Sequence, residues 1–234
     1  MTTNSIPHPY YPPEVQLSGG YVPNELGLVP LISRFVGLIA VHLGTTLTIA
    51  HVFNKRLDGK EQLVFLWFML CAFLHLFFEG YFITHHTSLA SSQSLFSQLW
   101  KEYSLSDSRY LTSNPFMLCI ETLTVFIWGP LCVLAAVLLV AEKRGLRHVA
   151  QIVLSVGHLY GVLLYYGTCA FEERYKGVGY SRPDALYYWG YYVGMNGLWV
   201  VVPTLLLLQS AREIHRRLRE KKVESKTKSP YHWL

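Results

Sequence analysis

Residues 115–141, PFMLCIETLTVFIWGPLCVLAAVLLVA, form an almost uninterrupted apolar run, and residues 63–83, LVFLWFMLCAFLHLFFEGYFI, form a second. Both reach the roughly 20 residues that cross about 30 Å of hydrocarbon as a helix. Three more apolar runs cover residues 35–53, 149–171 and 185–209. The sequence therefore predicts an all-α polytopic membrane protein, built as a bundle of five transmembrane helices.

The composition agrees with this class. Hydrophobic residues make up 51% of the 234 residues and charged residues only 15%, whereas soluble domains carry about 25% charged residues. The start of the chain has no basic segment followed by an apolar core, so we expect the first span to direct insertion. We divide the chain into an N-terminal non-cytosolic segment (1–29), a transmembrane domain (30–212) and a basic cytosolic tail (213–234).

The positive charges predict the orientation. With five spans, the side that holds the C-terminal tail also holds the first and third loops, and it carries most of the 20 Lys and Arg residues. The positive-inside rule then places the C-terminus in the cytosol and the N-terminus on the opposite side. The basic tail is also compatible with nucleic-acid binding, but beside a membrane span we expect it to contact lipid headgroups instead.

The loop at residues 84–114 is the longest, and its apolar and aromatic residues recur at roughly helical spacing between residues 95 and 103. This pattern predicts a short amphipathic helix at the membrane interface. Such a helix either caps a cavity or serves as an ordinary aromatic anchor, and the spacing alone leaves both open.

Two acids lie inside the apolar runs, Glu79 and Glu121. A carboxylate at membrane depth costs roughly 2.5 to 3.5 kcal/mol, so it usually faces the bundle interior and marks a site. His75 precedes Glu79 by four residues, and Thr124 and Trp128 follow Glu121 by three and seven, so each set shares a helical face. No Lys or Arg lies in a span interior to pair with these acids.

Structural roles compete with functional ones for the other polar residues. Asn196, taken alone, is more often an interhelical hydrogen bond than a catalytic group. The four cysteines (Cys71, Cys119, Cys132, Cys169) are expected to be packing thiols, since they lie in or beside apolar runs. His75 with Glu79 is half of a metal site at most, because no third ligand has a clear spacing, and we predict no metal and no cofactor.

A histidine and two carboxyls among aromatic side chains provide proton donors and acceptors. Indole faces stabilise a cation by roughly 0.5 to 2 kcal/mol. Together these groups suit protonation of an apolar substrate, a transient carbocation and loss of a different proton, which is a double-bond isomerisation. A proton or cation pathway is the weaker hypothesis, because only two spans carry acids.

Six motifs then occur in an order and spacing that resemble the emopamil-binding protein (EXPERA) family of sterol Δ8-Δ7 isomerases. They are HLFFEG (75–80), SQLWKEY (97–103), DSRY (107–110), ETLTVFIWGP (121–130), GHLYG (157–161) and MNGLW (195–199). The resemblance covers nearly the whole chain and implies a five-helix bundle in the endoplasmic reticulum membrane, with a lumenal N-terminus. It also implies a cholestenol Δ-isomerase activity, which transposes a C=C bond during sterol biosynthesis.

The resemblance also implies residue roles. His75, Glu79 and Glu121 match the family's proton-transfer residues, Thr124 and Asn196 match the polar groups that position them, and Trp199 matches the indole that stabilises the carbocation. Aromatic residues near the substrate are matched or predicted by helical spacing at Trp100, Tyr103, Tyr110, Trp128 and Tyr192.

Expected partners are a Δ8-sterol, membrane lipid and cationic amphiphilic amines acting as inhibitors, with no nucleic acid. The oligomeric state stays open, a homodimer included. His158 and Val162 depart from the glutamine and aspartate of animal members of the family. The alternative function is a non-catalytic sterol or cationic-amphiphile-binding membrane protein, since a branch of the family without isomerase activity keeps a similar His, Glu, Asn and Trp set.

Overall fold

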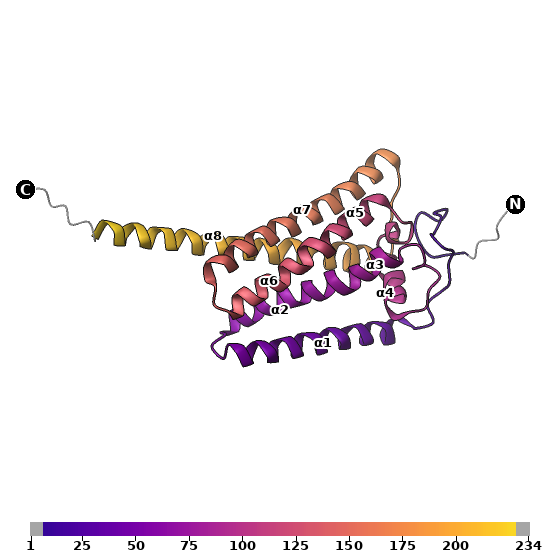
Figure 1. Ribbon diagram of the computed structural model, residues 1–234. Helices are drawn as coiled ribbons and strands as arrows, with labels where there is room; N and C mark the ends of the chain where they lie inside the picture. Colours follow the sequence, from indigo (N-terminus) through magenta and orange to yellow (C-terminus); the bar gives the residue numbers. More distant parts are fainter. Residues whose placement is uncertain (1–6, 228–234) are drawn as a thin grey trace, which may run out of the picture.

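A computed structural model describes residues 7–227, and these residues contain helices and no strands. Within this described part of the chain, five helical segments are long and apolar enough to cross a membrane, which confirms the predicted count. They run antiparallel to one another in chain order, and the described part of the chain begins and finishes at opposite ends of the bundle (Figure 1). The segments are Leu28–Phe53, Gly59–His85, Pro115–Val140, Gly145–Lys176 and Leu186–Val223.

Capping residues, a proline and a glycine determine where several of these segments begin and end. The second starts after Asp58, whose side chain accepts a hydrogen bond from the Glu61 N–H. The third starts at Pro115, and the side chain of Asn114 caps it by accepting from two backbone N–H groups. The fourth ends at Gly177, which adopts a left-handed conformation with φ of 66°.

Three of the spans are not uniform α-helices, because each contains a stretch of wider π-helical turns. A π turn inserts an extra residue, which rotates the following side chains by about 100° around the helix axis. The elements are α1 (Leu28–Phe53), α2 (Gly59–Phe73), η1 (Leu74–Glu79), α3 (Gly80–His85), α4 (Leu95–Tyr103), η2 (Ser108–Leu111), α5 (Pro115–Leu123), η3 (Thr124–Trp128), α6 (Gly129–Val140), α7 (Arg144–Lys176), η4 (Leu186–Met195) and α8 (Asn196–Thr227).

The predicted helix of the second loop is present as α4, and the structure shows that it packs inward. Trp100 is 2% exposed, and the N-terminal residues 7–27 cover the helix. The ammonium of Lys101 donates to the Val22 carbonyl at 2.8 Å, and the Asn24 amide donates to the Gln98 carbonyl at 2.9 Å. The position of α4 relative to a lipid surface stays a prediction.

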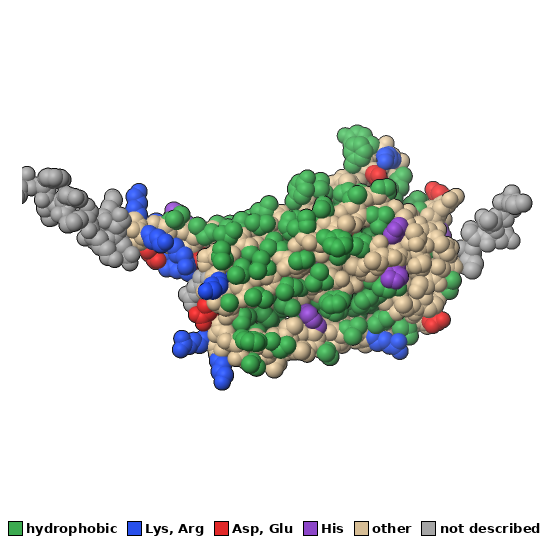
Figure 2. Space-filling model, in the orientation of Figure 1, with side chains coloured by type: hydrophobic (Ala, Val, Ile, Leu, Met, Phe, Trp, Pro, Cys, Tyr) green, Lys and Arg blue, Asp and Glu red, His purple; other side chains and the backbone are tan. Residues whose placement is uncertain are grey.

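The surface of the bundle fits a hydrocarbon environment. Large apolar side chains cover the faces of the five segments, and Lys and Arg gather at the end from which α8 emerges (Figure 2). α8 continues to Thr227, past the boundary predicted at residue 212. Its charged part is stabilised as a helix by ion pairs one turn apart, such as Arg216 with Glu213 and Glu220.

Candidate active site

A cavity of about 370 Å³ lies in the half of the bundle next to α4. Its wall is mostly apolar and receives residues from all five spans and from α4. This volume is typical of small-molecule sites. Ten of the eleven predicted site residues line it: His75, Glu79, Trp100, Tyr103, Tyr110, Glu121, Thr124, Trp128, Asn196 and Trp199.

Tyr192 is the predicted residue that does not line the cavity. Its ring packs against Tyr165 and Tyr166 at centroid distances of 5.7 and 5.2 Å. Its backbone carbonyl accepts a hydrogen bond from the Asn196 amide at 2.9 Å. Tyr192 therefore contacts the site through its backbone and through the neighbouring tyrosines.

The π-helical segment η1 carries His75 and Glu79. His75 is 2% exposed, and its Nδ1 lies 2.9 and 3.0 Å from the two carboxylate oxygens of Glu79. The carboxylate accepts the Nδ1 proton, which fixes the ring and directs Nε2 across the bundle. There, Nε2 of His158 lies 3.1 Å away. The helical spacing of His75 and Glu79 thus gives the predicted contact, but His158 extends it to a third group.

Glu121 is buried on α5 and is held by an aromatic donor. The hydroxyl of Tyr110 donates to its carboxyl at 3.0 Å. Burial, and then the nearby Glu121 charge, raise the pKa of Tyr110 well above its ordinary value, so this hydroxyl keeps its proton. Tyr110 therefore acts as a permanent donor to Glu121.

An ion pair anchors the turn η2 that carries Tyr110. Asp107 and Arg109 are both buried, and the guanidinium lies 2.7 Å from the carboxylate. Burial alone would lower the pKa of Arg109, but the Asp107 carboxylate outweighs it and raises that pKa. The guanidinium also donates to Thr168 on α7 and lies over the ring of Tyr165. The pair thus ties the second loop to the fourth span.

Asn196 links the fifth span to α4. Its amide donates to the Tyr103 hydroxyl at 3.1 Å, so the interhelical hydrogen bond expected of a lone membrane asparagine is present. Thr124 lines the cavity, but its hydroxyl donates to the Ile120 carbonyl at 2.8 Å within its own helix. Its oxygen lone pairs remain available to accept a hydrogen bond in the cavity.

Three indoles shape the wall. The Trp199 ring lies 6.5 Å from the His75 ring, between centroids. Trp100 donates to the Phe78 carbonyl at 3.0 Å and stacks on the Phe78 ring. Trp128 packs against Gly157 so closely that a Cβ there would meet its ring at 2.6 Å. The three indoles therefore line the same cavity as His75, Glu79 and Glu121.

Comparison with known proteins identifies the relatives of this arrangement. A family model described as EXPERA (EXPanded EBP superfamily) matches residues 95–210. The chain is 37% identical over 221 residues to the 3-beta-hydroxysteroid-Delta(8),Delta(7)-isomerase of Mus musculus, covering 92% of each chain. It is 30% identical to a probable enzyme of the same name from Oryza sativa subsp. japonica, over 94% of this chain and 98% of the relative.

The chain belongs to the EXPERA family. This confirms the resemblance read from the six motifs. The chain is also 36% identical over 168 residues to a protein with a different name, the protoglabretal synthase of Citrus sinensis, over 70% of this chain and 76% of that relative.

For this EXPERA protein, sequence reasoning missed two groups at the site and a pair of thiols that lies next to it, outside the cavity wall. The DSRY motif contains Asp107 and Arg109, but it does not indicate that they form a buried ion pair. Tyr165 lines the cavity and is 5% exposed. Cys71 and Cys132 lie beside His75 and His158. Cys71 precedes His75 by four residues, which is a readable signal, whereas Cys132 and His158 come from other spans.

Proposed function

We propose that the chain is a sterol isomerase that moves the B-ring double bond from Δ8 to Δ7. One observation carries the proposal: His75, Glu79 and Glu121 face one apolar, aromatic-walled cavity in a membrane-type bundle. A rigid hydrocarbon substrate fits such a wall. Relatives that match the chain over more than 90% of its length bear the name of this activity.

The chemistry requires one proton to be added and another to be removed. A proton adds to C9 of the Δ8 bond, the positive charge develops at C8, and a proton then leaves C7 to form the Δ7 bond. The two electrons of the new double bond come from the broken C7–H bond, so the shift is redox neutral and needs no hydride carrier. Glu79, through His75, and Glu121, beside Tyr110, are the groups that deliver and accept these protons.

The carboxyls act as one hydrogen-bonded set, and the proposal does not divide the acid and base roles between them. Trp199 and Trp128 line the cavity, and an indole face within about 6 Å of a cation stabilises it by roughly 0.5 to 2 kcal/mol. Asn196 and Thr124 position the polar groups. A cationic amphiphilic amine resembles the carbocation and is expected to inhibit.

We infer that the protein works in the endoplasmic reticulum membrane with its N-terminus in the lumen and α4 at the lumenal surface. The distribution of Lys and Arg supports this orientation, because these residues gather at the opposite end of the bundle (Figure 2). A glycosylation acceptor fused to the N-terminus tests it. Glycan addition there, with none on a C-terminal acceptor, is the expected result, and the reverse pattern contradicts the orientation.

Expression in a yeast strain that lacks its own sterol isomerase tests the activity. We expect Δ7-sterols to replace the accumulated Δ8-sterols. Persistent Δ8-sterols, despite good membrane expression, would contradict the proposal. In that case, purified protein that retains Δ8-sterol without converting it would favour the alternative function, a non-catalytic sterol-binding protein.

A further inference from the structure

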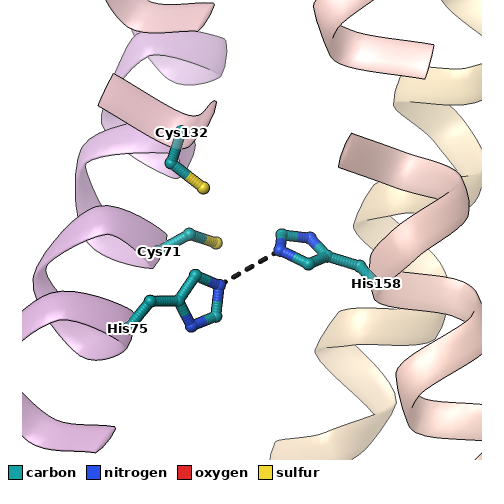
Figure 3. A group of neighbouring side chains, drawn as sticks. All are labelled: Cys71, His75, Cys132 and His158. Carbon is teal, nitrogen blue, oxygen red and sulfur yellow. Dashed lines mark hydrogen bonds between the residues drawn. The ribbon is translucent and has the colours of Figure 1, made fainter. Parts of the chain in front are cut away.

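Four metal-ligating side chains converge on one point in the middle of the bundle. Cys71 on α2, His75 on η1, Cys132 on α6 and His158 on α7 offer two sulfurs and two ring nitrogens, and these atoms all lie within 4.8 Å of one another. Figure 3 shows the four side chains pointing toward a shared centre from three spans. None of the four is more than 5% exposed.

We propose that these four residues bind one zinc-class divalent ion and that the bound ion inhibits the isomerase by occupying His75. A donor set of two thiolates and two imidazoles is the set that tetrahedral zinc favours. Hard ions such as Mg²⁺ and Ca²⁺ prefer oxygen ligands, and the cluster offers none. The site is therefore selective by chemistry for a borderline or soft metal.

The distances are close to those that a bound ion needs. With Zn–N of about 2.0 Å and Zn–S of about 2.3 Å, neighbouring ligand atoms of a tetrahedron lie about 3.3 to 3.8 Å apart. The Nε2 atoms of His75 and His158 are already 3.1 Å apart. The widest pair must close by about 1 Å, which is within reach of thiol rotation at Cys71 and Cys132.

Glu79 completes the site from behind. A metal-bound histidine almost always donates its other ring N–H to a carboxylate or carbonyl. His75 has this arrangement, because Glu79 accepts from Nδ1 at 2.9 Å while Nε2 faces His158 and the thiols. The ring is therefore already oriented as a metal ligand.

Charge balance suits a site inside a membrane. Binding displaces the protons of the two thiols, and two thiolates with two neutral imidazoles give a divalent ion a net charge of zero. A neutral centre avoids the cost of an unpaired charge in hydrocarbon. Packing accounts for each cysteine separately, but it does not explain why both thiols meet two histidines.

The consequence for catalysis rests on the proposed function. His75 lines the substrate cavity, and an ion on its Nε2 removes that nitrogen from proton transfer. Cys71 and Cys132 do not line the cavity. Metal binding and activity are therefore separable by substitution of the thiols.

Cobalt(II) is the probe for the site, used on the full chain in detergent with a reductant, after chelator treatment. We expect one Co²⁺ per chain, with tetrahedral d–d bands and a thiolate-to-cobalt charge-transfer band that Zn²⁺ removes. The double variant Cys71→Ser/Cys132→Ser should lose the charge-transfer band and bind at least about tenfold more weakly. The matched control is Cys119→Ser/Cys169→Ser, which also removes two thiols and should keep the band. Absence of the band from the unmodified chain, or its survival in the first variant, overturns the proposal.

Two further measurements keep the proposal testable if the serine variant does not fold. His158→Gln keeps both thiols but removes one ligand, so it should also weaken Co²⁺ binding at least about tenfold even if the serine variant fails to fold. Zn²⁺ should lower the isomerase rate at least about tenfold, reversibly on chelation, and should spare the active Cys71→Ser/Cys132→Ser variant. The metal-site proposal and the isomerase proposal can fail independently. A chain without isomerase activity would still show its metal site in the cobalt spectrum.

Discussion

The two halves of the bundle are built differently. In the half away from α4, which we call the closed half, most of the buried core residues are small or aliphatic, as at Ala135, Ala136 and Leu154. In the half next to α4, the cavity half, tyrosines, tryptophans and phenylalanines dominate the core, as at Phe82, Trp100 and Tyr110. Small residues let helices approach closely, whereas large rings hold them apart.

The polar groups differ in the same way. In the closed half they hold helix to helix: the Gln151 amide donates to the Leu206 carbonyl at 2.8 Å, and His148 pairs with Ser210 at 2.9 Å. In the cavity half, Glu121, Glu79 and His75 face an open space. The π-helical segments also lie in the cavity half, as is frequent at functional sites. Polar residues link helices in both halves, but only in the cavity half do buried acids of the spans also line a cavity among the described residues.

The largest effect is expected when the carboxyl of Glu121, which lines the cavity, is removed. Glu121→Gln keeps the shape and the Tyr110 contact but cannot transfer a proton, so we expect turnover to fall by about 10²- to 10⁴-fold with an unchanged fold. The rate of Δ8-to-Δ7 conversion measures the turnover, and a thermal unfolding curve checks that the fold is unchanged. Thr122→Val, at the next and exposed position, is the control. Full activity of Glu121→Gln would remove Glu121 from the mechanism.

A second test asks whether the cavity half depends on buried charge. Asp107→Asn leaves the Arg109 guanidinium buried without its partner, and loss of one partner of a buried pair costs about 3–5 kcal/mol. We expect a lower unfolding temperature and a weakened site, since η2 carries Tyr110. Asp184→Asn breaks the partly exposed pair with Arg182, which is worth at most about 1 kcal/mol. Equal decreases in unfolding temperature in the two variants would contradict the role assigned to Asp107.

A third test concerns the close approach of Trp128 to α7. In Gly157→Ala, the new Cβ would lie 2.6 Å from the indole, so the ring must move in the cavity wall. We expect a loss of about 1–3 kcal/mol in stability and a raised KM. Gly167→Ala is the matched control on the same helix, because nothing lies within 4 Å of its Cβ. That variant should keep its KM and gain up to about 1 kcal/mol.

The sequence predicted the elements of the fold better than their contacts. Five spans and a helix near residues 95–103 follow from apolar length and spacing, and the structure contains them. Ten of the predicted site residues share the cavity, although their roles in catalysis stay predictions. Helical periodicity was sufficient here because His75 and Glu79 belong to one segment, and because antiparallel neighbours can bring Glu79 and Glu121 to one depth.

Contacts between spans were harder to predict. Cys132 and His158 face His75 only because of how α6 and α7 are rotated. The π turn at η3, directly before α6, changes the direction of Cys132 by about 100°, and a 3.6-residue repeat in the sequence does not indicate it. Tyr192 shows the same limit: it shares a predicted face with Asn196, yet η4 turns its ring toward Tyr165 and Tyr166.

The smallest expected effect comes from the donor that holds Glu121. Tyr110→Phe removes one hydroxyl but keeps the ring against Trp100, 4.7 Å away between centroids. A single neutral hydrogen bond contributes about 0.5–1.5 kcal/mol, so we expect the isomerase rate to fall about three- to tenfold with little change in unfolding temperature. Tyr21→Phe, an equivalent deletion in the N-terminal segment, should leave the rate unchanged. A loss as large as that of Glu121→Gln would instead make the Tyr110 hydroxyl a proton-transfer group, because orienting a carboxyl cannot account for so much.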